Sequence, residues 1–233
     1  MTVVKPRRIA SLTSLVLVAA AVAAAPVRAE DRTVTAGTGP TLTREVIGQS
    51  VNGRPITLLH RAYAGATRRV LVVGSLHGNE RAGTRVVRRL LARADLPPQL
   101  DLWLIPTANP DGAVADRRTN ARGVDLNRNF GVGWRPSPQG LTWSGPRPSS
   151  EPETTVLRKA VQRIDPWLVV IFHQPLFGVG SSDKRPRVSA ALARAMALPV
   201  DEFNCGSVCR GTFTGWINQR TEGVGVTVEF GRT

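Results

Sequence analysis

The segment VLVVGSLHGNE, residues 70–80, decides the fold expected of this chain. It begins with an unbroken apolar run that ends in Gly74, as in a strand that is covered on both faces of a sheet. The polar turn that follows carries His77 and Glu80, three positions apart, where the chain would turn from the strand into a helix. In parallel sheets such turns lie at the carboxyl ends of the strands, where functional loops gather. The segment therefore predicts a covered sheet with polar chemistry along one edge.

The same arrangement repeats along the chain. Further apolar runs occupy residues 102–105, 168–172 and 224–230. Helical patterns with one apolar face occupy residues 83–93, 152–163 and 188–197. Strands that alternate with helices predict an α/β fold, a mostly parallel mixed β-sheet flanked by helices. Upstream, strand-like runs on both sides of Asn52-Gly53 predict an N-terminal β-hairpin.

The composition suits one well-buried domain, which we expect over residues 43–233. The chain has 233 residues, of which 42% are hydrophobic and only 5% aromatic, so the core should consist of Val, Leu, Ile and Ala.

Two further strand ends carry ionisable residues. His173 follows the run at 168–172, and Glu229 lies within the run at 224–230. Together with His77 and Glu80, His173 forms a set of two imidazoles and one carboxylate with a fourth position left open, which is typical of a catalytic zinc site. The His-x-x-Glu pair alone is also compatible with a glutamate that only stabilises a helix start.

Five segments, taken in order, resemble the zinc carboxypeptidase family. They are HGNE at residues 77–80, NPDG at 109–112, RTNARGVDLNRNF at 118–130, FHQP at 172–175 and TVEFG at 227–231. The resemblance covers residues 44–231, and the GVDLNRNF stretch is highly specific. Within the family, the segments look most like those of the bacterial murein peptide amidases, also called γ-D-glutamyl-diaminopimelate peptidases.

The resemblance implies a hydrolase with one Zn²⁺ per chain, held by His77, Glu80 and His173. It implies that Glu229 is the general base that activates a zinc-bound water. A general base must reach the proton that it removes, and zinc makes that proton more acidic.

Three other residues take roles from the resemblance. Arg118 is similar to the arginine that polarises the scissile carbonyl, with Arg117 and Arg122 as close alternatives. Asn127 and Arg128 resemble the pair that binds the terminal carboxylate of the substrate, for which an arginine offers a matching planar fork.

The sequence differs from the digestive branch of the family in two respects. Tyr63 is the only tyrosine, so no tyrosine lies between His173 and Glu229, where that branch carries a substrate-capping phenol. Removal of residues 1–29 would leave 233 − 29 = 204 residues, which is short for that branch. Both features favour a zinc metallocarboxypeptidase of the murein peptide amidase type, which cuts peptidoglycan stem peptides between D-glutamate and diaminopimelate.

Two alternatives have other chemistry. A zinc acylase of the aspartoacylase or succinylglutamate desuccinylase type shares a His-x-x-Glu plus His site and an Asn-Arg pair. A non-catalytic cell-wall binding module would be expected to have lost Glu229 or a zinc ligand, and all four residues are present.

The first 29 residues have the pattern of a secretory signal peptide. A basic start with Lys5, Arg7 and Arg8 precedes an apolar run at residues 9–25, and cleavage is expected after Ala29. Arg7-Arg8 leaves open whether export uses the general or the twin-arginine route. A membrane anchor is the alternative, but the run is at the short limit for a span. We therefore expect a secreted, cell-wall-associated enzyme with no stable membrane insertion, and a disordered mature start at residues 30–42.

The mature chain is strongly basic. Cleavage removes four of the 31 Lys and Arg residues and no acid, which leaves 31 − 4 = 27 against 17 Asp and Glu, a balance of +10. The arginines are scattered rather than clustered with aromatic residues, which argues against a nucleic-acid partner. We expect a peptide substrate, and attraction to anionic cell-wall polymers.

Cys205 and Cys209 are the only cysteines. An exported chain meets oxidising surroundings, so the sequence predicts a disulfide between them. A zinc pair is the alternative, but it lacks two further ligands nearby.

Overall fold

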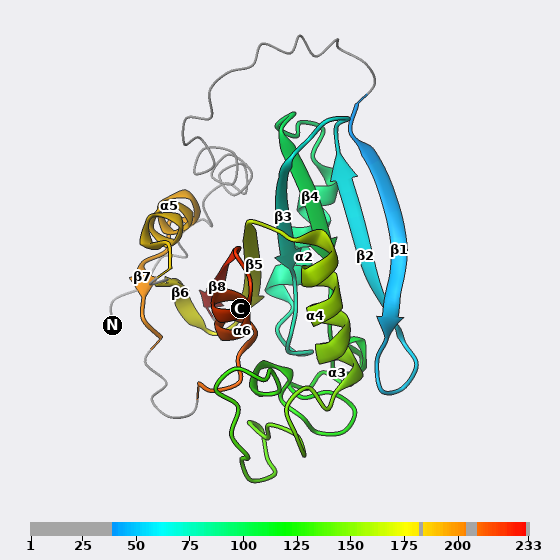
Figure 1. The fold of residues 1–233 in the computed structure, drawn as a ribbon, viewed down its shortest axis with the longest axis vertical. Coiled ribbons are helices and arrows are strands. Elements are labelled where there is room, and N and C mark those ends of the chain that lie inside the picture. The colour runs from blue at the N-terminus through cyan, green and yellow to red at the C-terminus, as the bar shows by residue number, and fades with distance from the viewer. Residues whose placement is uncertain (1–38, 182–183, 204–208, 232–233) are drawn as a thin grey trace, which may run out of the picture.

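An eight-stranded mixed sheet with helices on both faces forms the centre of the chain (Figure 1). The computed structural model describes residues 39–181, 184–203 and 209–231. The strand order is β1-β2-β4-β3-β5-β8-β6-β7. The strands are β1 (Thr41–Gln49), β2 (Pro55–Ala62), β3 (Arg68–Val73), β4 (Leu100–Ile105), β5 (Leu168–His173), β6 (Leu176–Gly180), β7 (Val200–Asp201) and β8 (Val224–Gly231).

The centre of the sheet is parallel, and antiparallel pairs lie on either side of it. The parallel pairs are β4–β3, β3–β5, β5–β8 and β6–β7. The antiparallel pairs are β1–β2, β2–β4 and β6–β8. Residues 50–54 form the turn of the β1–β2 hairpin, in which Gly53 has a φ of 74°. The predicted mixed sheet and N-terminal hairpin are therefore confirmed.

Helices cover the two faces of the sheet in two sets. The helices are α2 (Ala82–Ala92), α3 (Pro110–Val114), α4 (Pro152–Ile164), α5 (Pro186–Met196) and α6 (Phe213–Arg220), with a 3₁₀ turn, η1, at Leu126–Arg128. α2 and α5 pack on one face, whereas α4 and α6 pack on the other, which faces the viewer in Figure 1. In the part of the chain that is described, no helix is long and apolar enough to span a membrane.

The apolar runs form strands because both of their faces are covered. Every residue of β5 is buried. Along it, Val170 and Phe172 pack with α2 and α5, whereas Val169 and Ile171 pack with α4 and α6. This alternation follows from the two-residue period of a strand.

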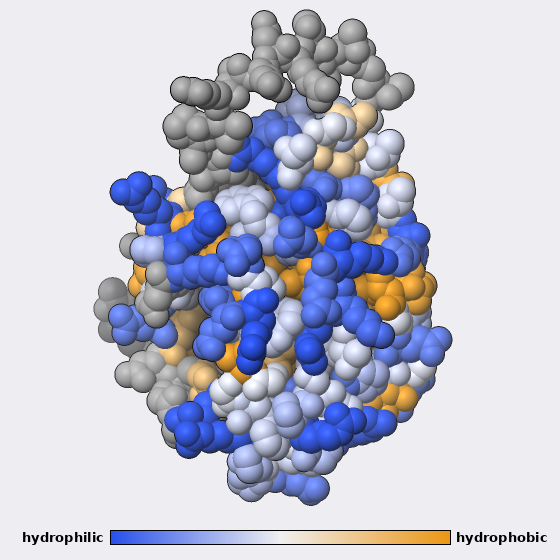
Figure 2. Space-filling view, viewed as in Figure 1, coloured by the Kyte–Doolittle hydropathy of each residue, from blue (hydrophilic) through white to orange (hydrophobic). Residues whose placement is uncertain are grey.

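On the face that carries α4, the surface is mainly polar. Figure 2 shows hydrophilic side chains over much of the face that carries α4, with smaller apolar patches between them.

A close approach places the start of α2 directly at the end of β3. A Cβ atom on Gly83 would lie 1.9 Å from the carbonyl oxygen of Gly74, so only glycine fits there. The short turn between β3 and α2 holds His77 and Glu80, and this contact fixes its position.

One predicted boundary is wrong. The domain begins at Thr41 rather than at residue 43, because Thr41 pairs with Ala62 and Leu42 with Arg61 in the hairpin, so the end of the segment 30–42 is not disordered. The predicted signal peptide at 1–29 lies outside the described residues, as does the remainder of 30–42 up to residue 38.

Candidate metal centre

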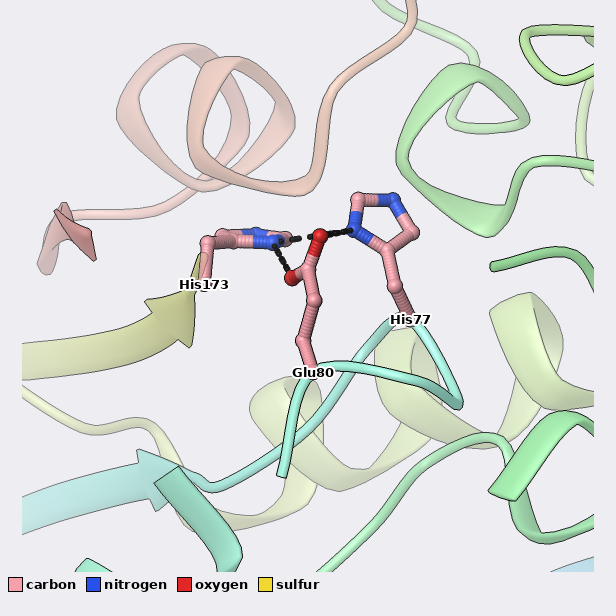
Figure 3. A group of neighbouring side chains, drawn as sticks. All are labelled: His77, Glu80 and His173. Atoms are coloured by element: carbon pink, nitrogen blue, oxygen red, sulfur yellow. Dashed lines mark hydrogen bonds and ion pairs between the residues drawn. The ribbon is translucent and has the colours of Figure 1, made fainter. Parts of the chain in front are cut away.

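His77, Glu80 and His173 lie together at the carboxyl edge of the sheet (Figure 3). His77 Nδ1 is 2.8 Å from Glu80 Oε1, and His173 Nδ1 is 2.8 Å from Glu80 Oε2. The two Nδ1 atoms are 3.2 Å apart. His77 is 2% exposed, Glu80 6% and His173 3%, so bulk solvent screens the interactions among their side chains only weakly.

The geometry of this group fits a zinc ion. Zn–N bonds of about 2.0–2.1 Å in a tetrahedral site separate two ligand nitrogens by about 3.3 Å, close to the observed 3.2 Å between the two Nδ1 atoms. Two imidazoles and one carboxylate also suit zinc better than calcium or magnesium, which prefer oxygen ligands. Among the described residues, no further His, Cys, Asp or Glu completes the group, as expected for a catalytic rather than a structural site.

The fold explains why these side chains converge. β3 and β5 are parallel neighbours, so the turn after β3 and the last residue of β5 meet at the same edge. Within that turn, Gly78 packs against α3, where an added Cβ would lie 2.0 Å from the carbonyl carbon of Gly112. This contact requires glycine and lets His77 and Glu80 approach each other.

Asp125 orients His77 from the other side of the ring. Its Oδ1 lies 2.9 Å from His77 Nε2, and its side chain is fully buried. A carboxylate at Nε2 favours the tautomer that carries its proton there, which leaves Nδ1 free to bind a metal. Asp125 belongs to the GVDLNRNF motif, but the motif alone does not indicate this role. The feature of the sequence that could have indicated this role is the position of Asp125 between Arg118 and the Asn127-Arg128 pair.

Opposite charges dominate the electrostatics of the group. Burial raises the pKa of Glu80, but His173 and His77 outweigh that effect and hold the pKa far below its ordinary range. Burial likewise raises the pKa of Asp125, and His77 and Arg118 reverse that shift. Both carboxyl groups are therefore ionised at neutral pH.

Arg118 is the candidate arginine that reaches this group. It donates from Nε and Nη2 to Asp125 Oδ2, at 3.0 and 2.8 Å, and from Nη1 to Glu80 Oε1 at 3.3 Å. Arg122 instead lies 3.5 Å from Glu151, and Arg117 is exposed. The position of Arg118 thus agrees with the predicted role in polarising a carbonyl, which stays a prediction.

Glu229 lies beside His173, because the two residues are partners in the parallel β5–β8 register. Its Oε2 accepts a hydrogen bond from the backbone N–H of Leu176 at 3.3 Å. Burial raises the pKa of Glu229 above its ordinary value, and the neighbouring Glu80 adds to this effect while His173 opposes it. A carboxylate that holds a proton more readily than usual is suited to general-base chemistry.

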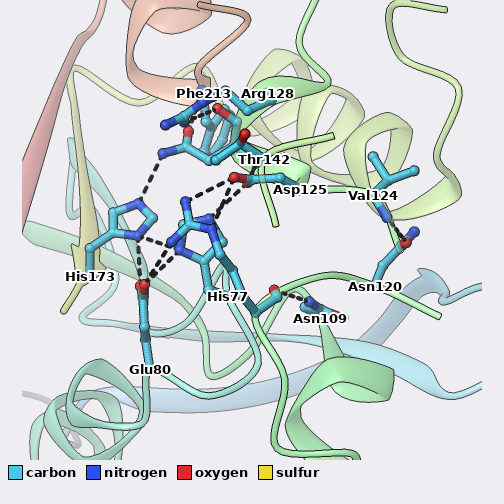
Figure 4. A network of polar contacts seen from close by, with 12 residues as sticks. His77, Glu80, Asn109, Asn120, Val124, Asp125, Arg128, Thr142, His173 and Phe213 are labelled. Atoms are coloured by element: carbon cyan, nitrogen blue, oxygen red, sulfur yellow. Dashed lines mark hydrogen bonds and ion pairs between the residues drawn. The ribbon is translucent and has the colours of Figure 1, made fainter. Parts of the chain in front are cut away.

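Asn127 and Arg128 lie on η1. Figure 4 shows Arg128 near the same edge as His77 and His173. Asn127 Nδ2 is 3.5 Å from His173 Nε2, and Asn127 Oδ1 accepts from the backbone of Phe213 at 3.0 Å. Arg128 donates to Asn127 O at 2.8 Å, and its Nη2 is 3.8 Å from Cys209 Sγ.

The guanidinium of Arg128 has unused hydrogen-bonding capacity. Its Nε is buried without a hydrogen-bond partner among the described residues. Burial lowers the pKa of Arg128, and the Asp125 carboxylate is near enough to oppose this shift in part. A buried cation with a free donor fits an anionic ligand. Cys205 lies outside the described residues, so the Cys205–Cys209 disulfide stays a prediction.

The fold and this group of side chains define a metallohydrolase of the carboxypeptidase type, and comparison with known proteins gives the family. The chain belongs to the zinc carboxypeptidase family, whose model matches residues 33–174. Murein peptide amidase A of Escherichia coli K12 is 32% identical over 186 residues, covering 74% of this chain and 75% of that protein. The Vibrio campbellii murein peptide amidase A is 30% identical over 188 residues, with coverages of 74% and 73%.

Solved structures agree with this assignment. The murein-tripeptide amidase MpaA from Escherichia coli O157 has a TM-score of 0.67 at 30% identity, covering 84% of this chain and 86% of that one. Carboxypeptidase A from Helicoverpa armigera also has a TM-score of 0.67, at 23% identity and with coverages of 81% and 59%, which shows a common fold. The predicted family, fold and hydrolase class are therefore confirmed.

Proposed function

We propose that this chain is a zinc-dependent peptidase that hydrolyses the amide between D-glutamate and diaminopimelate in peptidoglycan stem peptides. The observation that carries the proposal is the position of Glu229 directly beside the buried group of His77, Glu80 and His173. Its substrate class is supported by the murein peptide amidases among the relatives.

Each residue around the group has a chemical task in this proposal. Zinc held by the two histidines and Glu80 would supply Lewis acidity, which polarises a carbonyl and makes a water molecule more acidic. Glu229 accepts the proton of the attacking water and passes it to the leaving amine. The guanidinium of Arg118, fixed by Asp125, stabilises the negative charge that develops on the carbonyl oxygen.

Substrate orientation falls to Arg128. Its buried, unpaired Nε offers a charged donor for a carboxylate. Diaminopimelate carries a free carboxylate next to the amide that would be cut. This match between a carboxylate and an orphaned guanidinium donor supports a substrate with a free carboxylate next to the scissile amide. An N-acyl amino acid carries the same group, so the preference for a peptide rests on the murein peptide amidases among the relatives.

Export and cell-wall association complete the proposal. A signal peptide at residues 1–29 would deliver the enzyme to its substrate, and a mature charge of +10 (27 basic against 17 acidic residues) would attract it to anionic wall polymers. Since salt screens such attraction, release of the enzyme from isolated cell walls at high ionic strength is the matching test.

A digest of purified muropeptides tests the proposed reaction. Mass spectrometry should detect products that carry diaminopimelate as a new N-terminal residue, and a zinc chelator should abolish them. Glu229→Gln is the control for a contaminating peptidase, since it removes the base and keeps the side-chain shape. Cleavage at another bond, or cleavage that continues with the chelator present, would reject the proposal.

A further inference from the structure

Residues 118–125 belong to the loop that connects α3 to η1, and they carry two of the groups around the metal centre. Arg118 lies at the start of this segment and Asp125 at its end, and the two side chains meet at 2.8 Å. Hydrogen bonds from outside the segment hold its two ends. Arg118 O accepts from Asn109 Nδ2 at 3.2 Å, and Asp125 N donates to Trp143 O at 2.8 Å. The shape of the intervening loop sets how the two ends lie relative to each other. A residue that sets this shape can therefore affect the site without touching it.

Asn120 closes this loop with its backbone and its side chain. Its N–H donates to Val124 O at 2.9 Å, and its carbonyl accepts from Gly123 N at 3.0 Å. Its Oδ1 accepts from the backbone N–H group of Val124 at 3.0 Å (Figure 4). It also accepts from the backbone N–H group of Arg122 at 3.0 Å. The side chain is fully buried, so water does not replace these bonds.

The amide of Asn120 also anchors the loop to the rest of the protein. Its Nδ2 donates to Glu151 Oε2 at 2.7 Å and to Glu153 Oε2 at 3.2 Å, at the start of α4. Both carboxyl groups are buried, and Glu153 Oε1 in turn accepts from the backbone N–H of Val51 in the hairpin turn. Asn120 thus makes every hydrogen bond that an asparagine side chain offers.

We propose that Asn120, held by the buried carboxyl groups of Glu151 and Glu153, is a positioning residue that sets Arg118 and Asp125 in the catalytic site. This inference rests on the proposed function, because it assigns Asn120 an effect on that reaction. A displaced Asp125 would also weaken zinc binding through His77, but saturating zinc removes that contribution from turnover. At saturating zinc, Asn120 therefore acts on turnover through Arg118, and its effect should largely vanish when Arg118 is absent.

A double-mutant cycle with Asn120→Ala and Arg118→Ala tests this coupling. Displacement of a catalytic group by about 1 Å can cost about 100-fold, so Asn120→Ala should lower kcat at saturating zinc by about 10- to 100-fold, with little change in KM. In the Arg118→Ala background the same substitution should cost less than about 3-fold. Equal losses in the two backgrounds would overturn the inference.

Asn218→Ala is the matched control. Asn218 also uses both ends of its side-chain amide. Its Nδ2 donates to Gly225 O at 3.1 Å, and its Oδ1 accepts from Gly225 N at 2.7 Å. These bonds connect α6 to the start of β8, away from the loop that carries Arg118. Asn218→Ala should lower the stability of the protein. Its effect on kcat should be the same with and without Arg118. If Asn218→Ala couples to Arg118 as strongly as Asn120→Ala does, the effect is general destabilisation and the inference fails.

A second readout needs no catalysis. The Nε–H of Arg118 donates to Asp125 at 3.0 Å. Its proton should therefore be protected from exchange in ¹H–¹⁵N spectra, which can be recorded on protein stripped of zinc. Protection should be lost in Asn120→Ala and kept in Asn218→Ala. An inactive wild type would reject the proposed function and still leave this readout to decide the placement of Arg118.

If Asn120→Ala does not fold, the hydrogen bond between Asn120 and Glu151 can be tested by exchanging its donor and its acceptor. Asn120→Asp places a third carboxyl group against Glu151 and Glu153 and should abolish both turnover and the protected proton. Adding Glu151→Gln to Asn120→Asp exchanges donor and acceptor in the 2.7 Å bond and returns the cluster to the two carboxyl groups of the wild type. The double variant should therefore recover turnover and the protected proton at least 10-fold relative to Asn120→Asp. No restoration would contradict the anchoring role.

Discussion

Arg128→Ala should change which substrates the enzyme accepts rather than how fast it cuts all of them. The Arg128 guanidinium is buried, and its Nε has no hydrogen-bond partner among the described residues. A carboxylate of the substrate would supply the missing hydrogen-bond acceptor for this Nε. The loss of one hydrogen bond to a charged group costs roughly 1.5–3 kcal/mol, or about 10- to 150-fold in kcat/KM.

Paired substrates isolate this contribution. The stem tripeptide with a free diaminopimelate carboxylate next to the scissile amide is compared with the same peptide amidated there. Wild type should prefer the free acid, and Arg128→Ala should lose about 10- to 150-fold on it and little on the amide.

Arg117→Ala is the matched control, since it removes an exposed arginine from the same region of the chain. It should leave the ratio of the two kcat/KM values unchanged. If Arg128→Ala loses the same factor on both substrates, Arg128 holds the fold or the transition state and does not bind the carboxylate.

Three further outcomes are expected from the site. Glu229→Gln should retain its zinc and its melting temperature while kcat falls by about 10²- to 10⁴-fold, because the amide cannot accept a proton; near wild-type turnover would remove Glu229 from the mechanism. In the zinc-free protein, ¹³C NMR titration should place the pKa of Glu229 above the ordinary 4.5, because burial disfavours the charged form and the proton then leaves at higher pH; a pKa below 4.5 would contradict the described burial. Asp125→Asn should weaken zinc binding by about 10- to 100-fold in a chelator competition, because His77 loses the partner that fixes its tautomer; an unchanged affinity would show that Asp125 serves only Arg118.

Much of the fold was predictable because the core strands are buried on both faces. The runs that became β3 and β5 are continuously apolar, and the run that became β8 is interrupted by Thr227 and Glu229. α2 and α4 lie within two residues of the predicted ranges. The elements that were missed depend on tertiary contacts. β7 has only two residues and exists through its pairing with β6, whose sequence LFGVG contains two glycines and no clear alternation.

α6 was missed for a related reason. Its sequence FTGWINQR contains a glycine and a threonine, and lacks the apolar period of α2. The helix is defined by its cap, in which Thr212 accepts from Gly215 N, and by the burial of Phe213, Trp216 and Ile217.

The candidate site was predictable as a set of residues but not as a network. Strand ends and motif spacing brought His77, Glu80, His173 and Glu229 into one group, since parallel neighbours end at the same edge. The contacts of Asp125 and Asn120 follow from the shape of an irregular loop, for which the sequence has no periodic signal. The choice among three nearby arginines likewise required the direction of each side chain.

Zinc titration of the metal-free enzyme tests the central claim most directly. Hydrolysis of the stem tripeptide should rise in proportion to added zinc and stop at one equivalent per chain, and His173→Ala should show neither the sharp end point nor the activity. Full activity without zinc, an end point other than one, or an unchanged titration of His173→Ala would contradict the account.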